Sequence, residues 1–327
     1  MANEYIRLPT HSGSGTVTTY VRIPFFGGGG SPPVPPAGGK GIFGGGSTGS
    51  EVLTIDYITF PTASNATTFG NLTVARYTLA ACSSSTRGIF SGGQTNSNPE
   101  LSYIDYITIA TAGNATAFGN LTLARSDLAG FSNATRGIFV GGTSGFSASL
   151  RMDYVTIATT GAATIFGNLS IARSGLAGLS STTRGISGGG STGSLSLRID
   201  YVTIGTTGNA TTFGNLTIAR WTLAGLSSNT RGIFGGSATV LTSTIDYITI
   251  STTGNATTFG NLTVKRAGLS GTSNSILGIF GGGRFGSLPS LVVDYVTIAT
   301  TGNAITFGDL TQARQSLAGC SDSHGGL

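Results

Sequence analysis

Short runs of β-branched, aromatic and apolar residues alternate along the chain with stretches of Gly, Asn, Thr and Ser. Runs such as DYITI, RGIF and RxxLAG recur, each bounded by Gly or Asn turn signals, which is typical of strands. No copy of the pattern sustains the spacing of three and four apolar positions that an amphipathic helix needs over ten residues. The pattern therefore predicts an all-β protein.

These strands belong to a unit that the chain repeats six times. Residues 208–220 read GNATTFGNLTIAR and residues 254–266 read GNATTFGNLTVKR; looser copies begin at residues 64, 113, 161 and 302. An Asp-Tyr pair marks each copy, first at Asp56-Tyr57, and successive pairs lie 49, 48, 47, 46 and 48 residues apart. Such a period is typical of propellers or long helical repeats. About four strands per copy favour a propeller, so we expect six four-stranded blades.

The order of residues within a copy resembles the kelch repeat over residues 40–327. Each copy has a strand ending in Gly-Gly, then a variable stretch, the Asp-Tyr pair, a turn, an aromatic residue and an Arg. The aromatic is Phe69, Phe118, Phe166, Phe213, Phe259 or Phe307, and the Arg is Arg76, Arg125, Arg173, Arg220, Arg266 or Arg314. The family has Trp where this chain has Phe, and the single Trp of the chain, Trp221, lies elsewhere. The resemblance implies a kelch-like propeller.

The two ends of the repeat region complement each other. The chain enters the repeat at KGIFGGG (residues 40–46) and stops after ARQSLAGCSDSHGGL, where another RGIF would begin. We therefore expect the strand around Leu317–Cys320 to lie beside Ile42-Phe43 and to close the ring within the first blade.

Composition and charge narrow the functional classes. The 327 residues include 17 basic and 12 acidic side chains, a net charge of +5 that is not gathered into runs, which argues against binding to nucleic acid or to anionic membranes. No stretch approaches the roughly 20 apolar residues of a membrane span. The first residues, MANEYIRLPTHSGSG, do not resemble a secretory signal peptide. We expect a protein assembled in a cytoplasm, without membrane insertion.

Cysteine and asparagine positions favour structural roles. Cys82 and Cys320 occupy one position of the repeat, where other copies have mostly apolar residues, so we expect buried thiols rather than a disulfide. Ten N-x-S/T sequons, such as Asn65-Ala66-Thr67, resemble glycan acceptors. We interpret them as turns and strand ends.

The residues needed for catalysis or for holding a metal or cofactor are sparse. The two histidines, His11 and His324, lie in the N-terminal segment and in the last loop, too few for a histidine metal cluster. Six of the twelve carboxylates are the repeated Asp, and each copy also has the repeated Arg. We interpret them as structural ion pairs, the alternative being a ring of charges around a pore. The Gly-rich stretches lack the Lys of a phosphate-binding loop. The prediction is a protein that is not an enzyme and holds no cofactor.

The variable stretch between Gly-Gly and Asp-Tyr differs among copies in length and in residues. In an antiparallel meander it connects the second and third strands and emerges on the same face as the crossings between blades. Phe146, Arg284 and Phe285 are its bulky side chains, and we predict that they form a ligand-binding rim. The alternative is an unconstrained surface.

The N-terminal part of the chain differs from the repeats. Residues 1–26 contain strand-like alternation in EYIRLPT and GTVTTYVRIPFF, and residues 27–39 form a Gly/Pro-rich spacer. Two strands alone bury no core, so we expect residues 1–26 to act as a docking arm.

An N-terminal arm, a spacer and a rigid, disc-shaped propeller together favour a structural or receptor-binding appendage of a bacteriophage particle, such as a fibre, spike or decoration protein. In this hypothesis the arm docks to other virion proteins and the rim faces a glycan or protein on the host surface. Association of copies through the arm is left open. The alternative is a cellular kelch-type interaction module or a surface adhesin.

Overall fold

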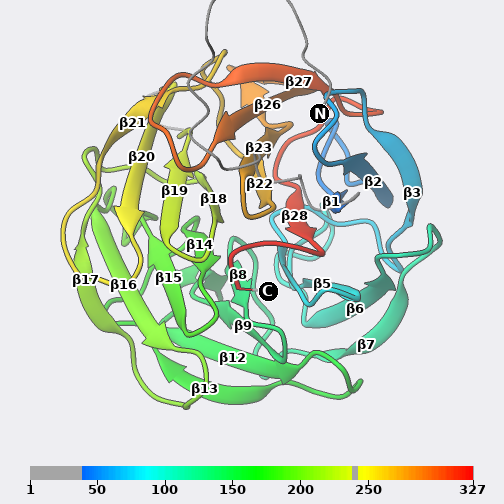
Figure 1. Ribbon diagram of the computed structural model, residues 1–327. Helices are drawn as coiled ribbons and strands as arrows, with labels where there is room; N and C mark the ends of the chain where they lie inside the picture. The colour runs from blue at the N-terminus through cyan, green and yellow to red at the C-terminus, as the bar shows by residue number, and fades with distance from the viewer. Residues whose placement is uncertain (1–38, 238–241, 327) are drawn as a thin grey trace, which may run out of the picture. The chain divides into compact units, whose positions relative to one another are not determined.

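The computed structural model describes residues 39–237 and 242–326, which form six four-stranded antiparallel sheets arranged as blades around a central axis (Figure 1). The fold is a six-bladed β-propeller, as the repeats predict. The predicted arm, residues 1–26, and the spacer apart from Gly39 lie outside the described residues.

Within each blade the four strands follow one another from the central axis outward. Blade 1 contains β28 (Ala318–Ser321), β1 (Lys40–Gly44), β2 (Thr54–Thr59) and β3 (Thr67–Asn71). Blade 2 contains β4 (Ala80–Ser83), β5 (Arg87–Ser91), β6 (Tyr103–Thr108) and β7 (Thr116–Asn120). Blade 3 contains β8 (Ala129–Ser132), β9 (Arg136–Val140), β12 (Arg151–Thr156) and β13 (Thr164–Asn168).

The remaining blades repeat this order. Blade 4 contains β14 (Ala177–Ser180), β15 (Arg184–Gly188), β16 (Arg198–Thr203) and β17 (Thr211–Asn215). Blade 5 contains β18 (Ala224–Ser227), β19 (Arg231–Gly235), β20 (Thr244–Thr249) and β21 (Thr257–Asn261). Blade 6 contains β22 (Ser270–Ser273), β23 (Leu277–Gly281), β26 (Val292–Thr297) and β27 (Ile305–Asp309).

The ring closes by pairing strands from opposite ends of the repeat region. β28 is antiparallel to β1, with Cys320 opposite Ile42 and Gly319 opposite Phe43. Figure 1 shows the red β28 beside the blue β1, close to the centre of the ring. The predicted closure is confirmed, and blade 1 therefore has the same inner edge as the other five.

Apolar side chains fill the spaces between neighbouring blades. In the second strand of every blade the last four residues are buried. Phe90 of blade 2 packs over Gly44 of blade 1, because a Cβ on Gly44 would lie 2.6 Å from the Phe90 ring. At the interface between blades 3 and 4 the larger side chain is on the other blade. Val140 of blade 3 has the register position that Gly44 has in blade 1, and Ser187 of blade 4 has the position that Phe90 has in blade 2. The exchange conserves the packed volume of the interface.

The repeated Gly-Asn-Ala sequence covers the outer edge of the preceding blade. Asn209 of blade 4 accepts a hydrogen bond at 3.0 Å from the amide of Asn168 in β13, and Ala210 N donates to Asn168 O at 2.8 Å. The same side-chain bond joins Asn114 to Asn71, Asn255 to Asn215, Asn303 to Asn261 and Asn65 to Asp309. These loops satisfy backbone groups of outer strands that would otherwise be open to pairing.

Candidate functional site

The propeller has two unlike faces. Each innermost strand runs toward a short turn on one face, here called the turn face, and each second strand returns to Gly-Gly on the other. This second face, called the loop face, holds the connections between second and third strands and the crossings between blades. Contact between the two is direct: Tyr77, in a crossing, and Gln94, after Gly92-Gly93, exchange backbone hydrogen bonds at 3.1 and 2.9 Å.

Phe146 lies at the tip of a small hairpin on the loop face of blade 3. The hairpin pairs β10 (Thr143–Ser144) with β11 (Ser147–Ala148), and its two turn residues, Gly145 and Phe146, have φ of 58° and 64°. Positive φ at both turn positions matches the twist of a two-residue hairpin. The Phe146 side chain is 89% exposed, so the turn presents an aromatic ring to solvent.

Arg284 and Phe285 belong to a second hairpin, on blade 6. It pairs β24 (Arg284–Phe285) with β25 (Leu288–Pro289). Phe285 is 55% exposed and Leu288 is 71% exposed. Arg284 donates a hydrogen bond to the carbonyl of Gly286 at 2.7 Å, within the hairpin. The exposed surface here is apolar with one cation beside it.

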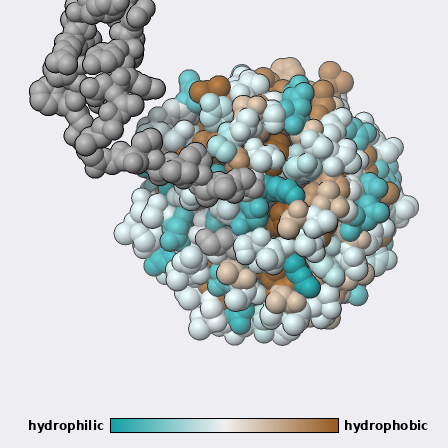
Figure 2. All heavy atoms as spheres, turned by 45° about the vertical axis from the view of Figure 1, so that its right-hand side comes forward, coloured by the Kyte–Doolittle hydropathy of each residue, from teal (hydrophilic) through white to brown (hydrophobic). Residues whose placement is uncertain are grey.

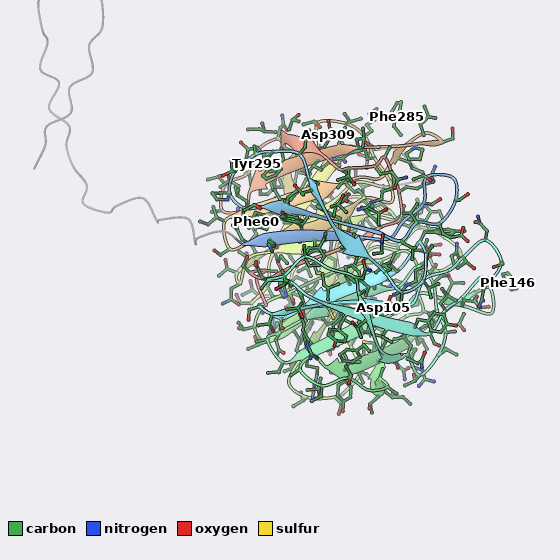
Figure 3. The ribbon with its side chains drawn as sticks, turned by 90° about the vertical axis from the view of Figure 1, so that its right-hand side faces the viewer. Phe60, Asp105, Phe146, Phe285, Tyr295 and Asp309 are labelled. Atoms are coloured by element: carbon green, nitrogen blue, oxygen red, sulfur yellow. The ribbon has the colours of Figure 1, made fainter. Side chains whose placement is uncertain are left out.

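The structure places these predicted residues on one face but does not bring all of them together. Figure 3 shows Phe146 and Phe285 at the same side of the propeller, opposite Phe60. Blades 3 and 6 lie across the ring from each other, so Phe146 stands apart from the Arg284–Phe285 pair. The rim is therefore two separate projections rather than one pocket.

The repeated Arg and Asp residues form buried ion pairs between consecutive blades. Arg125, in the crossing that leaves blade 2, contacts Asp153 of blade 3 at 2.7 Å, and it donates to the carbonyls of Gly141 and Arg151. Corresponding pairs, at 2.6–3.0 Å, are Arg76–Asp105, Arg173–Asp200, Arg220–Asp246, Arg266–Asp294 and Arg314–Asp56.

Burial gives these pairs their character. Desolvation lowers the pKa of Arg125 while the neighbouring Asp153 raises it. Each of the six Arg also has an Nε atom without a hydrogen-bond partner among residues 39–237 and 242–326. The pairs do not line either axial opening, so the pore alternative is wrong and the structural interpretation is confirmed.

A ring of serines closes the axis on the turn face. Ser180 Oγ donates to Ser132 O at 2.7 Å, and Ser132 Oγ donates to Ser83 O at 2.7 Å. The ring continues through Ser83, Ser321, Ser273 and Ser227 and returns to Ser180, with distances of 2.6–2.8 Å. Every blade thus donates one hydroxyl to its neighbour.

His324 covers this serine ring. Its Nε2 lies 3.2 Å from Ser132 Oγ and 3.3 Å from Ser83 O, while Gly326 N donates to its Nδ1 at 2.9 Å. Burial lowers the pKa of His324 to about 4, although the hydrogen bond to Ser83 O opposes the shift. Since the Ser132 hydroxyl already donates to Ser83 O, and no carboxylate is among the described residues that line this end, the Ser–His contact lacks the arrangement of an activated nucleophile.

The opposite, loop-face end of the axis is an open pit. Its floor is six leucines, called here the leucine floor: Leu79, Leu128, Leu176, Leu223, Leu269 and Leu317. Its rim is six residues, called the axial ring: Thr78, Asp127, Gly175, Thr222, Gly268 and Ser316. All six rim residues have positive φ, between 51° and 62°.

Backbone hydrogen bonds join the axial ring into a closed cycle. Asp127 N donates to Thr78 O at 2.9 Å and Gly175 N donates to Asp127 O at 2.8 Å. The other four bonds, at 2.6–2.9 Å, run in the same direction around the axis. Left-handed backbone is uncommon for residues other than Gly and is unusual for a β-branched Thr. The closed cycle of hydrogen bonds explains why the axial-ring residue of every blade has left-handed backbone.

Asp127 is the one ionisable residue among the twelve described residues that line the pit. Its carboxylate accepts no hydrogen bond and forms no ion pair with any residue in the described ranges. Burial raises the pKa of Asp127 to about 6. The sequence analysis missed this site. The only signal for it is that the residue before the Leu of each copy is Gly, Thr, Ser or, once, Asp.

The cysteines do not form a site. Cys82 and Cys320 are buried and unbonded, as predicted. Burial raises the pKa of Cys320 to about 12 and raises the pKa of Cys82 well above its usual range. Both thiols therefore stay protonated and unreactive at neutral pH.

The described residues contain neither a metal-binding cluster nor a candidate membrane-spanning helix. Within 39–237 and 242–326 there is no group of three or more His, Cys, Asp or Glu side chains that could hold a metal ion. The same part of the chain has no helix with the length and apolar character needed to cross a bilayer. Figure 2 shows strongly hydrophobic and strongly hydrophilic residues scattered over one side of the propeller rather than gathered by kind.

No family model matches the chain, and no curated protein matches its sequence.

Proposed function

We propose that this propeller is a non-enzymatic, kelch-like binding module that serves as an appendage of a phage particle. In this proposal residues 1–26 dock to other virion proteins and the loop face meets a glycan or protein on the host surface. The blades supply a rigid disc, and the connections on the loop face supply specificity.

The observation that carries the proposal is the exposure of apolar side chains in hairpins that only some blades possess. Among the described residues, Phe146 and Leu288 are the two most exposed large hydrophobics, at 89% and 71%, with Phe285 at 55%. A solvated aromatic ring on a rigid two-residue turn contributes no stability to the blade below it. Aromatic residues of this kind are enriched where proteins bind partners.

A direct test uses the fluorescently labelled full chain and cells of the host from which the particle is isolated. We expect the protein to bind these cells and to compete with particle adsorption. Replacing Phe146 and Phe285 together by Ser should reduce binding at least tenfold without lowering Tm, because both side chains are exposed.

The matched control is Ile165→Ser together with Ile305→Ser. These two side chains are 53% and 58% exposed but lie on the outer strands β13 and β27. Equal loss of binding in the control would show non-specific adhesion and overturn the role of the hairpins. An antibody to the propeller that fails to label purified particles would overturn the appendage proposal and favour a cellular interaction module.

A further inference from the structure

The axial pit on the loop face has a rim that offers hydrogen-bond acceptors and almost no donors. The six backbone N–H groups of the axial ring are all used within the ring. The hydroxyl of Thr78 donates to Tyr77 O at 2.7 Å, and that of Thr222 donates to Trp221 O at 2.8 Å. A hydroxyl whose hydrogen is used keeps its lone pairs for an incoming donor.

The charge of the rim has one sign. Asp127 supplies a carboxylate with two acceptor oxygens, and no cation among the described residues lining the pit balances it. Each neighbouring blade offers Thr, Gly or Ser at the corresponding place. An unpaired carboxylate in a partly desolvated position favours a cationic partner. An anion would meet both the carboxylate and the hydroxyl lone pairs, and it would be repelled.

Below the rim the pit is apolar. The six residues of the leucine floor line it and are each 4–5% exposed, while the ends of their side chains pack in the cores between blades. Trp221 is not one of the residues that line the pit, but it packs beside the rim: its Cε3 lies 3.1 Å from the position that a Cβ on Gly175 would take.

Side chains occupy the axial ring at a conformational cost. Thr78 and Thr222 have φ of 54° and 51°, where Gly175 and Gly268 show that Gly also fits. The closed cycle of backbone hydrogen bonds holds these residues in that conformation.

From these observations we infer that the axial pit binds a small primary alkylamine, whose hydrocarbon tail enters the pit and whose ammonium group stays at the rim. The ammonium group lies at the rim, between the Asp127 carboxylate and the Thr78 hydroxyl, and the methylene chain contacts the leucine floor. Recognition is by charge at the rim and by apolar contact below it.

The test uses the full chain and n-butylammonium as the probe, followed by the fluorescence of Trp221, the single Trp in the sequence. We expect saturable binding of n-butylammonium at pH 8, with 1-butanol and butanoate binding at least tenfold more weakly. Asp127→Asn should weaken binding of n-butylammonium at least tenfold. Asn tolerates left-handed backbone, so this variant keeps the axial ring.

The matched control is Asp309→Asn, which removes the same charge from an exposed outer strand and places there the Asn found in the other copies. It should bind n-butylammonium as the wild type does. Equal weakening by both variants would show a general charge effect and overturn the inference. Absence of saturable binding by the wild type, or equal binding of 1-butanol, would also overturn it.

This inference is independent of the proposed function. A propeller that binds n-butylammonium but not host cells keeps the pit and loses the attachment role. A propeller that binds host cells through Phe146 and Phe285 but does not bind n-butylammonium supports the attachment role and contradicts the amine site.

Discussion

The buried Arg–Asp pairs differ from surface ion pairs in what their removal leaves behind. A buried pair contributes little net stability compared with apolar residues, but breaking it strands a charge away from water. Among the described residues, Asp294 has one cationic partner, Arg266. Asp200 has two: the buried Arg173, and the more exposed Arg198 at 3.2 Å. The two positions therefore predict unequal costs for the same substitution.

We expect Arg266→Ala to lower the free energy of unfolding by about 3–5 kcal/mol, and Arg173→Ala to lower it less, because Arg198 still faces Asp200. Urea denaturation of both variants measures the difference. Replacing Arg266 by Met together with Asp294 by Leu should cost less than Arg266→Ala alone. If the double variant were the least stable, the pair would have to be strongly favourable by itself.

Asp127 makes stability depend on pH in a predictable direction. Burial raises its pKa from 3.8 to about 6, so the folded protein binds the proton more tightly than the unfolded chain. The ionised carboxylate therefore lowers the free energy of unfolding at pH values well above 6, and this destabilisation disappears as the pH falls toward 3.8.

We therefore expect Asp127→Asn to be more stable than the wild type by about 1–3 kcal/mol at pH 8, and nearly equal to it at pH 4. Thermal unfolding at the two pH values measures this, with Asp309→Asn as the control. A stability difference that is the same at both pH values would contradict a desolvated carboxylate at the rim.

At the scale of elements, each blade protects the outer edge of the blade before it. The Asn of Gly-Asn-Ala, which is Ser-Asn-Ala in blade 1, accepts a hydrogen bond from an outer strand at five of the six interfaces. At the sixth, blade 3 has Ala162 and keeps the backbone bond from Ala163 N to Asn120 O. The chain thus offers its own comparison between a blade with the side-chain bond and one without it.

We expect Asn209→Ala to lower the free energy of unfolding by about 1 kcal/mol and Ala162→Asn to raise it by a similar amount. Urea denaturation measures both, and hydrogen exchange at the amides of Asn168 and Asn120 locates the effect. Loss of stability in both variants would mean that Ala162 is required by the packing of blade 3.

At the scale of the whole molecule, the propeller closes through its own strands. β28 completes blade 1, and Asp322 accepts hydrogen bonds from Lys40 N at 3.0 Å, beside the closing strand. The described core therefore does not need residues 1–38 to satisfy a sheet edge.

Deleting residues 1–39 should leave a folded monomeric propeller with a nearly unchanged Tm and, under the proposed docking role, one that no longer joins a phage particle. Thermal unfolding and sedimentation test the first expectation, and incorporation into particles tests the second. Unfolding of the truncated protein would assign the arm to the core. Normal incorporation would instead assign docking to the disc and contradict a docking arm.

Much of the fold follows from the sequence because repetition makes a local pattern informative. Six copies in register gave the number of blades, four strands per copy gave their size, and the match between residues 40–46 and the last strand gave the closure. Polar residues that recur with the period, such as Arg125 and Asp153, could be assigned to the scaffold. Their pairing across a blade boundary required the structure, because sequence spacing alone does not distinguish partners within one copy from partners in the next.

The axial pit depended on tertiary structure. Thr78, Asp127 and Ser316 are ordinary loop residues in the sequence, far apart along the chain, and no local pattern predicts that they meet. Only closure of the ring brings six crossings to one axis, where their amides bond to one another and the Asp127 carboxylate has no partner within residues 39–237 and 242–326. The same closure sets Phe146 and Phe285 across the ring from each other. The sequence by itself determined the repeating contacts between neighbouring blades, whereas the surroundings of the axis arise from all six blades at once.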